Sequence, residues 1–159
     1  MTNAIVSARG SRVSSGVSDI LERELYPMIE AWLVRVEKGS DLTHIPLSHN
    51  ERTGHLPHLM HDVINRLRLD PGTKAPVSTA AGDHGDLRRK QGYTVAMMVE
   101  ESRLLQISIF TLLHQNVTQL EIKALLPDVV IIADEVDAQL KEQTLRFMAA
   151  DAAEKAKAR

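Results

Sequence analysis

Hydrophobic residues recur every three or four positions along most of the chain, which is the spacing of helices with one buried face. In the first such segment, after Ser18, the apolar positions are Leu21, Leu25, Met28, Ile29, Trp32, Leu33 and Val36. Ser18 is a suitable N-cap and Gly39 a suitable end for this helix. Pro27 lies inside the pattern, so we expect the helix to bend there or to restart with Pro27 in its first turn.

The same spacing returns at about 56–70, 77–91, 94–116 and 118–150, whereas the polar residues between 40 and 55 predict a loop with room for a short helical turn. Asp70-Pro71-Gly72 closes the second helix, Gly92 ends the third and Thr94 caps the fourth. Thr118 and Glu121 have the spacing of a capping box, which predicts that the last helix begins at Thr118.

No segment has the alternating pattern of a strand, and "VVII" at 129–132 lies inside a helical pattern that Pro127 should bend or restart. The sequence predicts an all-α fold, a single helical-bundle domain of about five to six helices with a long C-terminal helix, for which a globin-like arrangement is one form. Residues 1–17 are expected to form a flexible lead, 18–150 the domain, and 151–159 a charged helical or frayed tail.

The length of 159 residues suits one domain with its own core. The formal net charge is −2, with Lys and Arg spread along the chain, so nucleic acid or acidic lipid is not the expected partner. There is no cysteine, which excludes disulfides, thiolate zinc sites and cysteine nucleophiles and favours a reducing cytoplasm. No segment predicts membrane insertion.

His55, His58 and His61 stand three apart, which raises the question of a metal site. Nothing in the sequence requires their side chains to converge, so we interpret them as surface histidines and predict no metal. Catalytic motifs for phosphate binding, zinc hydrolysis and serine hydrolysis are missing, and we expect no catalysis and no cofactor.

His84 differs, because helical spacing places it on the inner face of its helix among small residues. A buried imidazole requires a hydrogen-bond partner. The candidates on the next helix, which a short Gly-Tyr connection turns back alongside, are Glu100, Glu101, Ser102 and Gln106. Three interpretations of His84 remain open: a structural hydrogen-bonded histidine, part of a ligand pocket or pH-sensitive joint, and a haem ligand.

Charged residues near His84 predict surface ion pairs. Glu100 and Glu101 diverge on a helix and cannot form a carboxylate dyad, so we expect them to pair with nearby arginines, namely Arg88, Arg89 or Arg103. Asp86 and Lys90 stand four apart, the spacing of a stabilising helical pair.

The fourth helix is apolar on more than one side. Its main face is predicted to hold Val95, Met98, Val99, Ser102, Leu105, Ile109, Leu112 and Leu113. Candidates for a homodimer interface are Met97, Leu104 and Ile107 on its other side and Val129, Val136 and Leu140 on the last helix. A helix that is apolar nearly all round is either central in a monomer or shared with a second subunit.

The stretch "HGDLRRKQGYTVAMMVEESRLLQISIFTLL" resembles a known pattern, His-Gly-x-x-Arg-x-x-x-Gly-Tyr-(Ser/Thr)-hydrophobic followed by Glu-(Tyr/Phe/Ser)-Arg-x-Leu. That pattern is typical of the helical N-terminal domain of RsbT co-antagonist (stressosome, RsbRD-type) proteins, which also precedes the kinase part of bacterial sensor histidine kinases. The likeness spans roughly residues 20–147. The residues that match the motif are His84, Gly85, Arg88, Gly92, Tyr93, Glu101, Arg103 and Leu105.

This resemblance implies a cytoplasmic, dimeric sensory or regulatory input module for bacterial stress signalling, without catalysis of its own. It also implies an output partner such as a kinase, an anti-sigma factor or a STAS-type protein. The chain stops where an output region would begin, so we expect an excised input domain or a stand-alone relative. The alternatives are a haem or small-molecule sensor with a pocket beside His84, and a helical scaffold that binds a partner protein.

Overall fold

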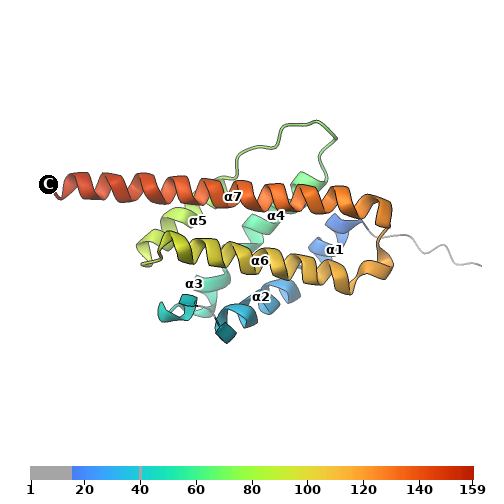
Figure 1. Ribbon diagram of the computed structural model, residues 1–159, viewed down its shortest axis with the longest axis horizontal. Helices are drawn as coiled ribbons and strands as arrows, with labels where there is room; N and C mark the ends of the chain where they lie inside the picture. The colour runs from blue at the N-terminus through green and yellow to red at the C-terminus, as the bar shows by residue number, and fades with distance from the viewer. Residues whose placement is uncertain (1–15, 40) are drawn as a thin grey trace, which may run out of the picture.

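The computed structural model describes residues 16–39 and 41–159, and every regular element in those residues is helical (Figure 1). The predicted all-α fold with a long C-terminal helix is therefore confirmed. In chain order the elements are α1 (Val17–Arg23), α2 (Leu25–Gly39), η1 (Asp41–His44), α3 (His49–Thr53), α4 (Leu56–Leu67), α5 (Thr79–Lys90), α6 (Val95–Gln115), η2 (Val117–Gln119) and α7 (Ile122–Lys157).

The predicted lead at 1–17 lies outside the described residues except for its last two positions, and Val17 already belongs to α1. Gly16, not Ser18, is the N-cap of this helix. Of the two outcomes expected at Pro27, a bend or a restart of the helix, the structure shows a restart. α2 begins at Leu25 and holds Pro27 in its first turn. The proline ring crowds the carbonyl four residues earlier, that of Arg23, which is the residue where α1 ends.

Side-chain caps position α5 and α6. The Ser78 hydroxyl accepts a hydrogen bond from the amide of Ala81 at 3.0 Å, so α5 begins two residues later than Val77. Thr94 caps α6 as predicted by accepting from the amide of Met97. Between the two helices Gly92 has φ +90, a left-handed conformation that glycine adopts without strain and that turns the chain from α5 into α6.

The predicted start of the last helix is wrong. Thr118 lies in the short η2 turn, and α7 begins at Ile122 with Glu121 as N-cap but without a side-chain cap bond. Leu120 between them is buried and extended, so its insertion into the core sets the direction of the chain before α7. Pro127 lies inside α7, which continues past it and through the predicted tail to Lys157.

Figure 1 shows α6 and α7 side by side across the bundle, with α4 and α5 against α7 and α2 against α6. The core between them is apolar. Its largest fully buried hydrophobic side chains are Trp32, Ile20, Leu21, Leu42, Leu56, Met60, Ile64, Met98, Ile109, Ile132 and Val36. Each contributes about 1.5–3 kcal/mol relative to an exposed position, which is enough to hold the helices in one arrangement.

Some residues lie on faces other than those predicted. Val99, expected on the main face of α6, is 46% exposed, whereas Leu104 and Val136, expected at a dimer interface, are buried in the core of their own chain. The candidates Met97, Ile107, Val129 and Leu140 are half-buried. In the described part of the chain, no helix has the length and apolar content that crossing a membrane requires.

Candidate functional site

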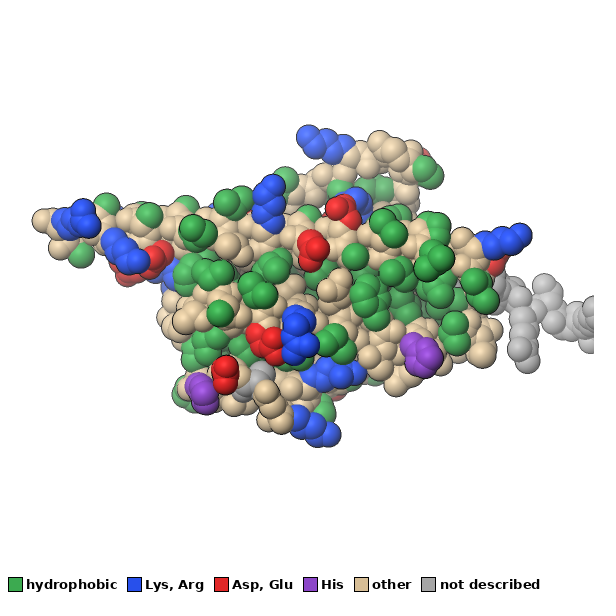
Figure 2. Space-filling model, viewed as in Figure 1, with side chains coloured by type: hydrophobic (Ala, Val, Ile, Leu, Met, Phe, Trp, Pro, Cys, Tyr) green, Lys and Arg blue, Asp and Glu red, His purple; other side chains and the backbone are tan. Residues whose placement is uncertain are grey.

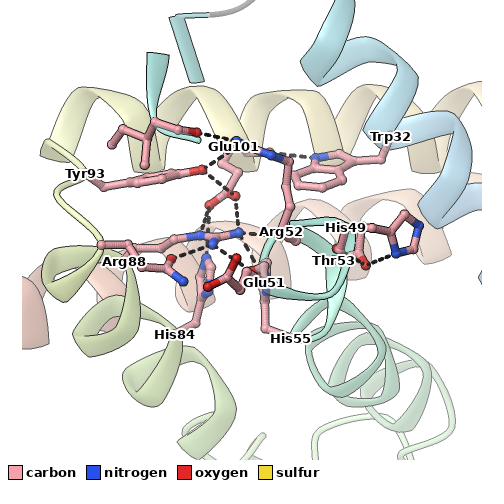
Figure 3. A network of polar contacts seen from close by, with 12 residues as sticks. Trp32, His49, Glu51, Arg52, Thr53, His55, His84, Arg88, Tyr93 and Glu101 are labelled. Atoms are coloured by element: carbon pink, nitrogen blue, oxygen red, sulfur yellow. Dashed lines mark hydrogen bonds and ion pairs between the residues drawn. The ribbon is translucent and has the colours of Figure 1, made fainter. Parts of the chain in front are cut away.

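The motif residues around His84 converge in one buried network (Figure 3). His84 and Arg88 lie four apart on the same face of α5, and the Gly92 turn brings Glu101 of α6 opposite them. Tyr93, the last residue before the Thr94 cap, points back into the same space. Helical spacing and one tight turn therefore bring these four residues together from the single stretch 84–101.

Glu101 is the centre of the network and is 4% exposed. Its Oε2 accepts from His84 Nε2 at 3.1 Å and from Arg88 Nε at 3.1 Å, and its Oε1 accepts from Arg88 Nη2 at 2.6 Å. The Tyr93 hydroxyl donates to Oε1 at 3.4 Å. The expected hydrogen bond from His84 to a residue of the next helix is therefore confirmed.

Arg88 is fully buried, and each of its N–H groups has an acceptor. Besides Glu101, it donates to the Gln91 side chain at 2.7 Å, to the Glu51 carbonyl at 3.0 Å and to the Arg52 carbonyl at 2.8 Å. The predicted pairing of Glu101 with an arginine is confirmed, but not as a surface contact. Because both charges are buried, loss of one partner would leave the other unpaired, at a cost of about 3–5 kcal/mol.

Tyr93 extends the network towards α3. Its hydroxyl accepts from Arg52 Nη1 at 3.0 Å, and Arg52 Nη2 in turn donates to the Ile45 carbonyl at 2.7 Å. The Arg88 guanidinium lies 4.8 Å from the centre of the Tyr93 ring, within the range of a cation–π contact. Burial and the neighbouring Glu101 carboxylate raise the pKa of Tyr93 to about 12.

His55 also belongs to this site although the sequence did not identify it, as is true of Arg52 and Gln91, and its interpretation as a surface histidine is wrong. Its ring stacks on that of His84 with centroids 3.7 Å apart and an angle of 11°. The ring of Trp32 lies perpendicular to that of His55, with centroids 6.4 Å apart and an angle of 83°, and the indole N–H donates to the Glu101 carbonyl at 3.2 Å. His58 and His61, in contrast, are exposed as predicted.

Burial determines the charge states of the site. It lowers the pKa of His84 from its ordinary value, although the Glu101 carboxylate acts in the opposite direction. Burial holds the pKa of His55 well below its usual range, and the neighbouring His84 and Arg88 act in the same direction. Burial alone would raise the pKa of Glu101, but the hydrogen bond from His84 and the charge of Arg88 lower it. The network therefore holds two neutral imidazoles beside an ionised Glu101–Arg88 pair.

Cavities lie on both sides of the imidazole stack. The inner one, about 10 Å³, is bounded by Gln139 and Gln143 of α7 and has room for a single water at most. The outer one, about 320 Å³, is a groove between α4 and α5 that His58 and Asp83 line together with the two stacked histidines. The groove has the volume of a small-ligand site, whereas a haem on the inner side would require the helices to separate.

The side of α5 next to His84 packs directly on α7. A Cβ at Gly85 would collide with the Gln143 carbonyl oxygen and lie 2.9 Å from its Cα, so only glycine permits this backbone approach. Ion pairs of 2.6 Å from Asp86 to Arg146 and from Arg89 to Glu154 flank the contact. Asp86 therefore pairs with Arg146 and not with Lys90 as predicted. Arg89 pairs with Glu154 of α7 instead of with a glutamate of α6.

Two further motif residues lie apart from the polar network. Arg103 is exposed and pairs with Glu100 at 2.8 Å, on the outside of α6. Leu105 is buried and lines the inner cavity beside Glu101. The structure thus brings together most of the motif residues and leaves Arg103 at the surface.

The chain was also compared with known proteins. No protein-family model, curated protein or solved structure matches it. The resemblance of residues 84–105 to the RsbRD-type pattern therefore stays a prediction, and the site is interpreted from its own geometry.

Proposed function

We propose that the chain is a non-catalytic input module of a bacterial signal-transduction protein. A stimulus is received in the core around His84 and Tyr93 and is relayed along α7 to an output partner such as a kinase, an anti-sigma factor or a STAS-type protein. The RsbRD-type motif supports this assignment, because its residues form a packed, hydrogen-bonded joint between helices.

Most support comes from the contact between this joint and α7. His84 faces the network while the next residue, Gly85, touches the backbone of Gln143 on α7. A change in the position of α5 cannot be absorbed by side-chain rotation at a backbone-to-backbone contact, so it passes to α7. The C-terminal turns of α7 extend beyond the rest of the bundle, where a partner can contact them (Figure 1).

We also propose that the active form is a homodimer paired through α7. Ile122, Leu126 and Val130 follow one another at four-residue steps and are 71%, 70% and 67% exposed. Figure 2 shows hydrophobic side chains gathered along α7 and the adjoining α6 on one face of the molecule. An apolar stripe along a helix is the usual basis for helix–helix pairing between two copies of a chain.

Light scattering at high micromolar concentration tests this proposal. The wild type should have the mass of a dimer, and Leu126→Asp should have that of a monomer because a charge would be buried at the interface. Val77→Asp is the matched control, since Val77 is similarly exposed, at 74%, but lies in the loop before α5. A monomeric wild type, or a Leu126→Asp variant that stays dimeric, contradicts pairing through α7.

A small-molecule sensor is the second candidate, and the groove of about 320 Å³ beside His55 and His84 favours it. Haem is the simplest ligand to test, by adding it to the purified protein. A Soret band that disappears in His84→Ala would support the haem form of this function. A protein that stays colourless excludes it.

A further inference from the structure

Two stacked imidazoles lie at the junction of α4, α5 and α6, and their tautomers decide what the site can accept. His84 Nε2 donates to Glu101, so His84 Nδ1 carries no proton. His55 Nδ1 lies 3.5 Å from Arg88 Nη2, which can only donate, so His55 Nδ1 is also unprotonated. In both rings, the next proton must therefore bind at Nδ1.

Neither Nδ1 can take a proton in this conformation. His84 Nδ1 is buried and has no hydrogen-bond partner among the described residues, so an N–H there would be an unsatisfied donor. His55 Nδ1 faces the guanidinium of Arg88, so an N–H there would place donor against donor and positive charge against positive charge. The stack is compatible with two neutral rings only.

The surroundings offer little to stabilise a new positive charge. The charged or titratable side chains of the described residues around the two rings are Arg52, His58, Asp83, Arg88, Tyr93 and Glu101, while α2 and α7 contribute the neutral Trp32, Gln139 and Gln143. Arg88 already neutralises Glu101. Asp83 lies in the outer groove, so a charged ring would be stabilised only by moving towards that groove and the water in it.

The donor atoms of this cluster are of the kinds that bind a metal ion. A metal ion and a proton differ in the charge that each would add to the cluster. Donor atoms of His55, His84 and Glu101 lie within 4.8 Å of one another. A divalent cation would compete with Arg88 for Glu101 and would place two further positive charges in the buried cluster. A proton adds one charge, and the groove gives that charge a route to solvent.

We infer that the stimulus received at this site is the proton: acidification protonates the His55–His84 pair, separates the stacked rings and shifts α5 against α7. This inference rests on the proposed function, since it names the stimulus of the same module. Gly85 follows His84 directly and abuts the backbone of Gln143, so a displacement of the His84 ring reaches α7 within one residue.

The fluorescence of Trp32 can report this change. Trp32 is the only tryptophan in the chain, its ring lies perpendicular to that of His55 at a centroid distance of 6.4 Å, and its N–H is bonded to the Glu101 carbonyl. The emission of the full chain should be followed from about pH 7.5 to about pH 5. We expect a transition with a midpoint below the ordinary histidine pKa of 6.5. It should persist in the His58→Gln control and disappear in His55→Gln and His84→Gln.

Two further readouts make the result independent of how well the variants fold. In the wild type, NMR should show the rings of His55 and His84 titrating below the ordinary histidine pKa of 6.5. Amide exchange of α7 around Gln143, corrected for the intrinsic effect of pH, should increase together with the emission change.

Emission that is flat in the wild type, or a transition that His84→Gln leaves unchanged, overturns proton sensing. Constant protection of the amides around Gln143 overturns the link to α7. The light-scattering test at about pH 7.5 is independent of these results, because both histidines are neutral there. A monomer with a normal pH transition would contradict the dimeric relay and keep the proton site.

Discussion

The two buried glycines of α5 allow the packing of α5 on α7 to be tested with a matched pair of substitutions. Gly82 and Gly85 lie three residues apart on the same helix, so Gly→Ala has the same intrinsic effect at both. In a helix interior that effect is a gain of about 1 kcal/mol. Any difference between the two variants therefore reports what each new methyl group meets.

The two methyl groups meet different obstacles. At Gly85 the new Cβ collides with the carbonyl of Gln143, a backbone group that cannot rotate away, whereas at Gly82 the nearest atom is Arg146 Nη1 at 3.3 Å, on a flexible side chain. Overpacking costs about 1–3 kcal/mol, and a backbone clash belongs at the upper end of this range. Subtracting the gain in helix propensity leaves Gly85→Ala destabilised by about 2 kcal/mol, while Gly82→Ala should be neutral or stabilised by up to about 1 kcal/mol.

Urea unfolding followed by circular dichroism measures this difference. For a chain of this length, about 2 kcal/mol also corresponds to a fall in Tm of about 4–8 °C. The expected order of stability is Gly82→Ala, then wild type, then Gly85→Ala. If Gly85→Ala were as stable as Gly82→Ala, α5 and α7 would not be in backbone contact at Gln143, and the proposed relay would lose its structural basis.

Three further predictions concern the buried network. Arg88→Met should lower the free energy of unfolding by about 3–5 kcal/mol in urea titration because it leaves Glu101 buried and unpaired, whereas Arg103→Met, at an exposed pair, should leave the urea midpoint unchanged. In an absorbance titration of the phenols, Tyr93 should ionise at about 12, and Tyr93→Phe should remove that step. As the pH falls below 6.5, the urea midpoint of the wild type should fall, because the pKa values of His55 and His84 are lowered in the folded chain and the unfolded chain therefore binds protons first. A midpoint that rises towards acid would contradict two neutral histidines.

The inward position of His84 and its bond to Glu101 could be predicted from sequence. Helical spacing defines the face on which His84 lies, and the short connection around Gly92 places the next helix within reach. The position of His55 was missed although a signal was present: it is the N-cap of α4 with helical backbone angles and stands one turn before the buried Leu59, on the apolar side of that helix. Its place in the site is set by the turn between α3 and α4.

Contacts between helices also change the ion pairs and the exposed helix faces that local spacing predicts. Asp86 stands four residues from Lys90, but a partner on α7 is better placed to reach it. For Leu104 and Val136, helical spacing identifies an apolar side without showing whether that side meets the same chain or a second one. The sequence therefore predicts which residues are apolar and helical, and only the assembled bundle shows which of them stay exposed, where a partner can contact them.

Nitrogen NMR of the imidazole of His84 at about pH 7.5 tests the buried joint most directly. A neutral Nε2–H tautomer with slow proton exchange is predicted, because this ring is 3% exposed and donates to Glu101. A ring that exchanges rapidly between tautomers, as in a free histidine in water, would contradict the joint on which the proposed relay depends.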